Sequence, residues 1–95
     1  MTNNTALRRY ELEVEGSTAY ITYEQKDSRR LLIHTVVPDA LAGKGVASAL
    51  ARSVLEDARR IGLKVVPECE FIAAFIKRHS EFQDLVADSD PNALS

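Results

Sequence analysis

The most informative stretch of this chain is Val37-Pro38-Asp39-Ala40-Leu41-Ala42-Gly43-Lys44-Gly45-Val46-Ala47. It follows an apolar run typical of a strand and leads directly into a long amphipathic helix. A Gly-x-Gly turn between a strand and a helix leaves several backbone N–H groups facing one concavity, and the positive end of the helix dipole adds to them. The order strand, glycine turn and helix therefore predicts a phosphate-binding loop.

The helix after the glycines is the clearest element of the sequence. Between Val46 and Ile61, apolar residues recur at three- and four-residue spacing, while most charged residues fall on the other face. Gly62 stands where a glycine ends many helices, and Arg59 and Arg60 before it complement the negative end of the dipole. We therefore expect a helix over residues 46–61.

Three strands are expected before this helix, at Leu7 to Val14, Thr18 to Glu24 and Leu31 to Val37. The turns between them are short and polar, which favours an antiparallel meander. The third strand is apolar on both faces, so we expect it to be covered on both sides. Its alternation places His34 on the same face as Leu32 and Val36.

A short strand at Leu63 to Val66 and a helix at about Cys69 to His79 follow, and a last turn packs through Phe82, Leu85 and Val86. A strand, helix and strand in succession imply a parallel pair between Leu31–Val37 and Leu63–Val66. The expected fold class is α+β (mixed α/β), in the order β-β-β-α-β-α: an antiparallel meander, then a parallel pair that carries the glycine loop.

Composition indicates one small soluble domain. The chain has 95 residues, of which 45% are hydrophobic and 27% charged. We expect the domain to span residues 7–86, with flexible tails at residues 1–6 and 87–95. The net charge of −2 gives no general attraction to nucleic acid. With a single cysteine, no signal-peptide pattern and no apolar run long enough for a membrane, we expect a cytoplasmic protein with no membrane partner.

From roughly Arg9 to Val86 the sequence resembles the small, truncated branch of the GCN5-related N-acetyltransferases. The coenzyme A signature of that family is Gln/Arg-x-x-Gly-x-Gly/Ala after a strand that ends in Val-x-Pro. The motifs Val37-Pro38 and Gly43-Lys44-Gly45-Val46-Ala47 match it in register, and Leu63–Pro67 and Ala73–His79 resemble the strand and helix that follow.

This resemblance implies that acetyl-CoA is the cosubstrate, with its pyrophosphate on the loop amides and its pantetheine arm between the two parallel strands. No metal is implied, and no His or Cys pair has metal-ligand spacing. Two positions depart from the family pattern. Ala42 replaces the usual Gln or Arg, and Phe75 lies near the position where many family members have a tyrosine that can protonate the departing thiolate. The expected coenzyme-binding residues are Val37, Ala42, Gly43, Lys44, Gly45, Val46, Ala47 and Phe75.

Two side chains are candidates for the chemistry of acetyl transfer to an amine. His34 lies in the third strand, where much of the family places an acidic base, and histidine can accept a proton near neutral pH. Cys69 lies at the mouth of the second parallel strand and near a helix N-terminus, which favours a thiolate. Glu68 and Glu70 flank it and oppose that effect. Each residue also has a plain structural interpretation, as part of the core or of an exposed surface.

Two functions of different classes follow from the sequence. The first is an acetyltransferase that moves the acetyl group of acetyl-CoA to an amine. Because the chain lacks the strands and helices that build the acceptor site in longer relatives, an amine on a protein or peptide is favoured over an enclosed metabolite. The alternative is a non-catalytic acyl-CoA-binding or protein-interaction module, which Ala42 and Phe75 favour slightly.

Overall fold

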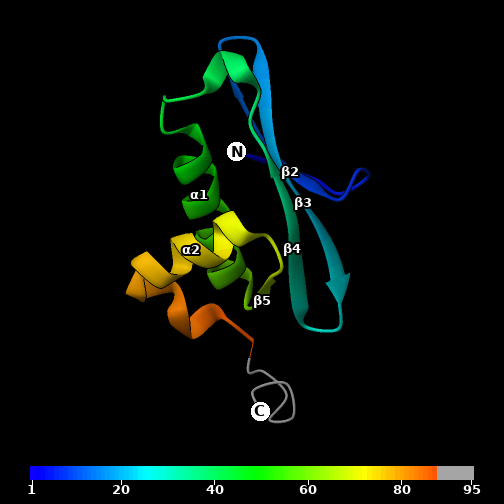
Figure 1. The fold of residues 1–95 in the computed structure, drawn as a ribbon. Coiled ribbons are helices and arrows are strands. Elements are labelled where there is room, and N and C mark those ends of the chain that lie inside the picture. Colours follow the sequence, from blue (N-terminus) through cyan, green and yellow to red (C-terminus); the bar gives the residue numbers. More distant parts are fainter. Residues whose placement is uncertain (88–95) are drawn as a thin grey trace.

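The computed structural model of the chain describes residues 1–87, which form a sheet with two helices on one of its faces (Figure 1). The strands and helices, in chain order, are β1 (Thr2–Asn4), β2 (Arg9–Val14), β3 (Ser17–Lys26), β4 (Arg29–Val36), α1 (Val46–Ile61), β5 (Lys64–Pro67) and α2 (Glu70–Arg78). Two short 3₁₀ helices, η1 (Asp39–Leu41) and η2 (Ser80–Leu85), complete the fold.

The strands lie in the order β1-β2-β3-β4-β5. Neighbours from β1 to β4 are antiparallel, whereas β4 and β5 are parallel. This arrangement confirms the α+β class, the antiparallel meander and the parallel pair expected from the sequence. Helix α1 makes the connection between the two parallel strands, as the order strand, helix, strand requires.

Strand β1 was not expected, because we interpreted residues 1–6 as a flexible tail. Thr2 to Asn4 instead pair with β2, and the Tyr23 hydroxyl donates a hydrogen bond of 2.7 Å to Asn3. A polar edge strand held by backbone pairing leaves no hydrophobic periodicity in the sequence. At the other end, Ala87 is buried and its N–H donates to the Val65 carbonyl. The rest of the expected C-terminal tail, residues 88–95, lies outside the described residues, and the domain limits at residues 7 and 86 stay a prediction.

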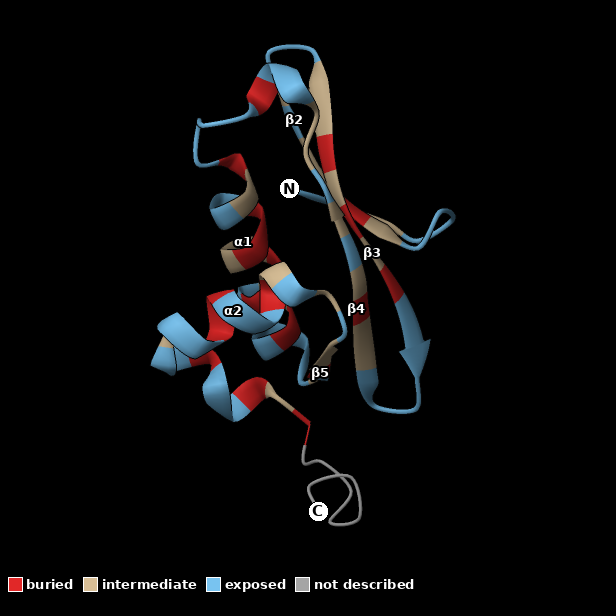
Figure 2. Ribbon diagram, in the orientation of Figure 1, coloured by how far each residue is buried: buried red, intermediate tan, exposed pale blue. Residues whose placement is uncertain are grey.

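Helix α1 packs against one face of the sheet and supplies much of the core (Figure 2). Its buried residues are those with the apolar spacing seen in the sequence: Val46, Leu50, Ala51, Val54, Leu55 and Ala58. Gly62 adopts φ +78°, and its N–H donates to the carbonyls of Ala58 and Arg59. This left-handed conformation, which costs glycine little, ends the helix at the expected residue.

The other face of the sheet is not covered by a helix (Figure 1). The expectation that the third strand is covered on both sides was therefore wrong: in β4 only Leu32 is fully buried, and Val36 is 38% exposed. Because both helices pack on one face, outward-facing apolar residues of β4 stay partly accessible. Within residues 1–87, no helix has both the length and the apolar content needed to cross a bilayer.

Candidate active site

The glycine loop joins β4 to α1 at one end of the sheet. Buried Leu41 anchors the loop in the core, and Lys44 N–H donates to its carbonyl oxygen. Gly43 and Gly45 adopt φ values of +77° and +72°, a region that disfavours residues with a side chain. A Cβ built on either glycine meets no atom within 4 Å, so the loop borders open space.

The N-terminus of α1 carries no neutralising group of its own. Gly45 is its N-cap and offers no side-chain hydrogen bond, and the first turn contains no acidic residue. The first N–H groups of a helix have no acceptor within the helix, and the dipole places partial positive charge on them. This end of α1 therefore suits an anion such as a phosphate.

The expected coenzyme-binding residues fall into two groups. Residues 42–45 are exposed and Val37 and Ala47 are half-buried, while Val46 is buried where α1 begins. Phe75 lies apart from them in α2. Its ring is 2% exposed and stacks on the His79 ring with centroids 4.0 Å apart. Its role in coenzyme binding stays a prediction.

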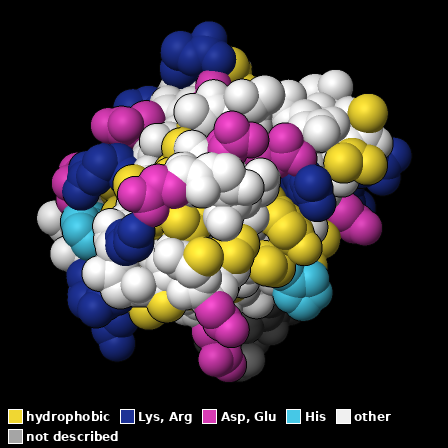
Figure 3. Space-filling view, turned by 90° about the horizontal axis from the view of Figure 1, so that it is seen from above, with side chains coloured by type: hydrophobic (Ala, Val, Ile, Leu, Met, Phe, Trp, Pro, Cys, Tyr) yellow, Lys and Arg dark blue, Asp and Glu magenta, His cyan; other side chains and the backbone are white. Residues whose placement is uncertain are grey.

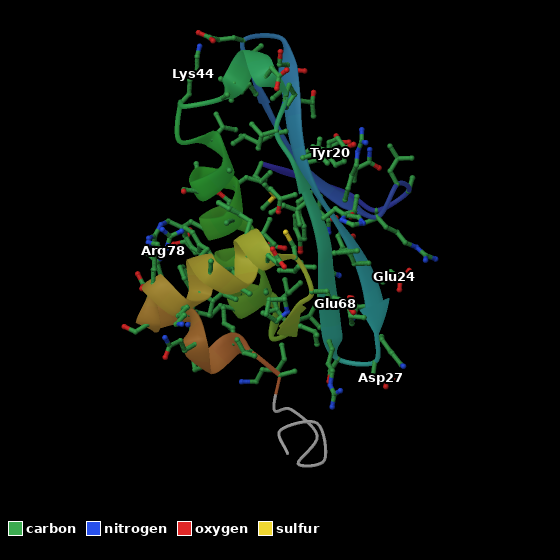
Figure 4. The ribbon with its side chains drawn as sticks, viewed as in Figure 1. Tyr20, Glu24, Asp27, Lys44, Glu68 and Arg78 are labelled. Carbon is green, nitrogen blue, oxygen red and sulfur yellow. The ribbon has the colours of Figure 1, made fainter. Side chains whose placement is uncertain are left out.

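Lys44 extends from the loop toward the turn between β2 and β3 (Figure 4). Its Nζ atom forms an ion pair of 2.5 Å with the Glu15 carboxylate. Both side chains are substantially exposed, so water and salt weaken this pair. Lys44, one of the expected coenzyme-binding residues, thus has its charge paired with a carboxylate in this structure.

The two parallel strands β4 and β5 separate before β4 reaches the glycine loop. Their pairing runs from Arg29 and Lys64 to Leu32 and Pro67 and goes no further. The Leu32 carbonyl accepts hydrogen bonds from the N–H groups of Glu68 and Cys69, at 2.9 and 3.0 Å, as the chain turns away into α2. The remainder of β4, up to Val36, therefore has no strand partner on that side, which leaves backbone groups available to an extended ligand.

A β-bulge in β4 decides where His34 points. Thr22 pairs with His34, but the next residue, Tyr23, pairs with Leu32, so one residue of β4 is extra. Because a bulge changes the alternation of side chains, Leu32 faces the core whereas His34 is exposed on the uncovered face. The predicted shared face of Leu32 and His34 was wrong for this reason.

Cys69 lies on the opposite face, at the N-terminus of α2. Its Sγ atom is 3.3 Å from the Thr35 hydroxyl of β4, across the point where the strands have separated. Burial raises the pKa of the Cys69 thiol, but hydrogen bonds from the Thr35 hydroxyl and from the backbone of Ile72 and Phe71 outweigh it. The net pKa is lowered, which favours the reactive thiolate.

The structure thus brings Cys69 and Thr35 together and places His34 behind them, on the other side of the sheet. Thr35 was not predicted as a site residue. Its approach to Cys69 depends on the bulge and on the strand separation, and no local sequence pattern predicts either feature. Seen from the end that carries the glycine loop, hydrophobic side chains form a band between charged groups (Figure 3). An apolar surface of this kind suits a thioester arm.

Comparison with known proteins agrees with this geometry. A protein-family model described as GCN5-related N-acetyl-transferase matches residues 9–85. The chain is also similar to a GCN5-like putative N-acetyltransferase from Staphylococcus aureus, whose solution structure was determined by NMR. The two share 28% sequence identity and superpose with a TM-score of 0.64, over 96% of this chain and 95% of that one. The matched residues include the glycine loop, both parallel strands and both helices.

Proposed function

The chain belongs to the GCN5-related N-acetyltransferase family, and we propose that it binds acetyl-CoA at the glycine loop and transfers the acetyl group to an amine. One observation carries the proposal. The uncapped N-terminus of α1, which has no acidic residue in its first turn, follows β4 in the chain, and the part of β4 beyond Leu32 has no partner in β5. An anion site next to free strand backbone matches a ligand with a diphosphate at one end and an extended amide-containing arm at the other.

The residues around the place where β4 and β5 separate have distinct roles in this proposal. The loop amides hold the diphosphate, and the free backbone of β4 beyond Leu32 aligns the arm. A backbone N–H of this segment faces the thioester oxygen and stabilises the negative charge that develops as the amine attacks. The C–S bond then breaks, and the coenzyme leaves as a thiolate that takes up a proton.

Two routes for the acetyl group use the two candidate residues differently. In direct transfer, His34 accepts a proton from the acceptor ammonium on the uncovered face of the sheet, and the neutral amine then attacks the thioester carbonyl. In the two-step route, the Cys69 thiolate attacks the thioester first, and the amine then takes the acetyl group from Cys69. Hydrogen bonding at Cys69 supports the second route, and exposure of His34 supports an acceptor that arrives from outside.

The acceptor in this proposal is an amine exposed on a protein or peptide. The face of the sheet that carries His34 has no helix over it, so no described element encloses a small metabolite there (Figure 1). An extended or protruding amine reaches such an open surface without any change in the fold.

The test is thermal unfolding of the wild type and of Gly45→Glu, with and without acetyl-CoA. At a hundredfold excess over Kd, a ligand stabilises the native state by about 2.7 kcal/mol. For a domain of this size, the melting temperature rises by roughly 10–20 °C. Gly45→Glu places a carboxylate at the anion site and abolishes the rise.

No rise in a cooperatively melting wild type contradicts the coenzyme site. A rise without release of free coenzyme in the presence of peptide amines contradicts catalysis alone. That second outcome favours the non-catalytic acyl-CoA-binding module, which Phe75 also favours because its buried ring has no proton to donate.

A further inference from the structure

Strands β3 and β4 lie side by side and pair in two registers that differ by one residue (Figure 1). On one side of the bulge Tyr23 lies opposite Leu32, and on the other side Ile21 lies opposite Thr35. All of these except Thr35 are buried. Because directly opposite residues of an antiparallel pair share a face, Thr35 lies on the helix-covered face together with Ile21.

The bulge sets the faces of two side chains at once. Without the extra residue, β4 would continue one position out of its observed register. His34 would then lie opposite Ile21 on the helix-covered face. Thr35 would lie opposite Tyr20 on the uncovered face. In the observed register the two are exchanged, so that His34 is exposed on the uncovered face and the Thr35 hydroxyl reaches Cys69.

A side-chain hydrogen bond fastens the bulge. The backbone N–H of His34 donates to the Thr22 Oγ1 atom at 3.1 Å. A bulge interrupts the ladder of backbone hydrogen bonds, so an N–H group there needs another acceptor. The hydroxyl of the opposite residue supplies it, and the β-branched side chain restricts the directions that this hydroxyl takes. In the register without the bulge, Ile33 would lie opposite Thr22, so this hydrogen bond favours the bulged register.

We propose that Thr22 is a positioning residue, whose hydroxyl holds β4 in the bulged register and so presents His34 to the acceptor and Thr35 to Cys69. The part that concerns acetyl transfer rests on the proposed function, whereas the placement of Thr35 beside Cys69 does not. The same hydroxyl serves both routes of transfer, because His34 acts in the direct route and Cys69 in the two-step route. In this role Thr22 touches neither the coenzyme nor the amine.

Three variants test the role of the hydroxyl. Thr22→Val removes the acceptor but keeps the shape and the strand preference of the side chain. We expect it to lower kcat with a peptide amine by at least about fivefold, the population shift that corresponds to one lost hydrogen bond. Thr22→Ser keeps a hydroxyl and should restore kcat. Thr18→Val makes the same change elsewhere in β3, opposite Glu13, and should leave kcat unchanged.

Two further measurements need neither coenzyme nor acceptor. Iodoacetamide labelling against pH reports the thiol of Cys69, whose pKa the Thr35 hydroxyl lowers. The midpoint of labelling should rise in Thr22→Val and stay at the wild-type value in Thr22→Ser. Cross-strand NOE contacts between Ile21 and Thr35 report the register itself and should weaken only in Thr22→Val.

The outcomes separate this inference from the proposed function. Wild-type kcat and an unchanged midpoint in Thr22→Val overturn the inference and leave the proposed function intact. Equal losses in Thr22→Val and Thr22→Ser also overturn it, because the hydroxyl is then not the cause. So does a fall in kcat with unchanged NOE contacts, because the register is then kept without the hydroxyl.

If the wild type transfers no acetyl group, the proposed function fails, and the midpoint and the NOE contacts still decide whether Thr22 holds the register. Thr22→Ala, which also lacks the hydroxyl, takes the place of Thr22→Val if that variant does not melt cooperatively.

Discussion

The Thr35 hydroxyl of β4 lies 3.3 Å from Cys69 Sγ, past the last residues at which β4 and β5 pair. The contact lies where β4 and β5 have separated, which is the place that we propose for the acetyl-bearing end of the coenzyme. Thr35 comes from β4 and Cys69 from the N-terminus of α2, 34 residues later. The two residues therefore meet only because the strands separate, and the Thr35 hydroxyl lowers the pKa of the Cys69 thiol.

Replacing Thr35 with valine should raise the pKa of the Cys69 thiol, because it removes a hydrogen bond that lowers this pKa and keeps the side-chain shape. A lowered pKa means that the thiolate forms at lower pH, so alkylation of the wild type should begin below the range of an ordinary thiol. Rates of iodoacetamide labelling against pH measure this midpoint. Thr18→Val, in β3 and paired with Glu13 away from Cys69, is the matched control and should leave it unchanged.

A labelling profile that is identical in wild type and Thr35→Val would show that the hydroxyl does not act on the thiol. Intact-protein mass spectrometry after incubation with acetyl-CoA separates the two routes of transfer. An adduct of one acetyl group that is absent in Cys69→Ser supports the two-step route. Turnover by Cys69→Ser at the wild-type rate excludes it.

Replacing His34 with glutamine should lower kcat about a hundredfold or more, as loss of a general base does. The affinity for coenzyme should stay the same, because His34 is exposed on the face away from Cys69 and the loop carries the coenzyme contacts. Initial rates with a peptide amine, together with calorimetry for coenzyme, separate the two effects. Full turnover in His34→Gln would remove this residue from the mechanism.

The glycines at the two ends of α1 allow a matched comparison. Gly45 and Gly62 have φ values of +72° and +78°, and a Cβ at either meets no neighbour. Alanine at each position should therefore cost about 1–2 kcal/mol of stability through backbone strain alone. Only Gly45→Ala should also weaken coenzyme binding, because only its Cβ enters the anion site. Equal coenzyme affinity in the two variants would argue against the loop as that site.

Glu15 should compete with the coenzyme for Lys44. Its carboxylate pairs with the Lys44 ammonium, and an incoming phosphate has to displace it or repel it. Glu15→Gln should therefore bind coenzyme more tightly, by about twofold to fivefold, the range of an exposed ion pair. Glu13→Gln, which removes the same charge two residues earlier, in β2, serves as control. Titrations at low and high salt should show the difference shrinking as screening increases.

Tyr10 should make the fold sensitive to alkaline pH. Its hydroxyl donates to Asp57 and accepts from Arg30, and burial raises its pKa to about 12. The unfolded chain loses this proton near pH 10, while the native state keeps it, so unfolding becomes easier as pH rises from about 10 to 12. The contribution of Tyr10 is complete below pH 10. Thermal melts of wild type and Tyr10→Phe should converge over this range.

At neutral pH, Tyr10→Phe should be less stable by about 1 kcal/mol, since it leaves Asp57 and Arg30 short of one partner each. Tyr20→Phe is the control, because Tyr20 lies half-exposed on the uncovered face. A parallel decline of wild type and Tyr10→Phe between pH 10 and 12 would show that another group causes the loss.

Prediction from the sequence succeeded where the signal is local. Helix α1 begins and ends at the predicted residues, because its apolar spacing and its terminal Gly62 all lie within one continuous segment. It failed where two distant segments decide the outcome. Strand β1 has no pattern of its own, and the direction of His34 follows from a bulge that exists only in the pairing of β3 with β4.

The sequence by itself determined the order of elements, the class of fold and the glycine loop, because periodicity and backbone preference act over a few neighbouring residues. Only the tertiary structure decided which groups meet: Thr35 with Cys69, Lys44 with Glu15, and Arg52 with the rings of Phe75 and Phe82. These contacts join residues far apart in the chain. Their geometry depends on how the sheet twists, bulges and separates, and that is fixed by the packing of the whole domain.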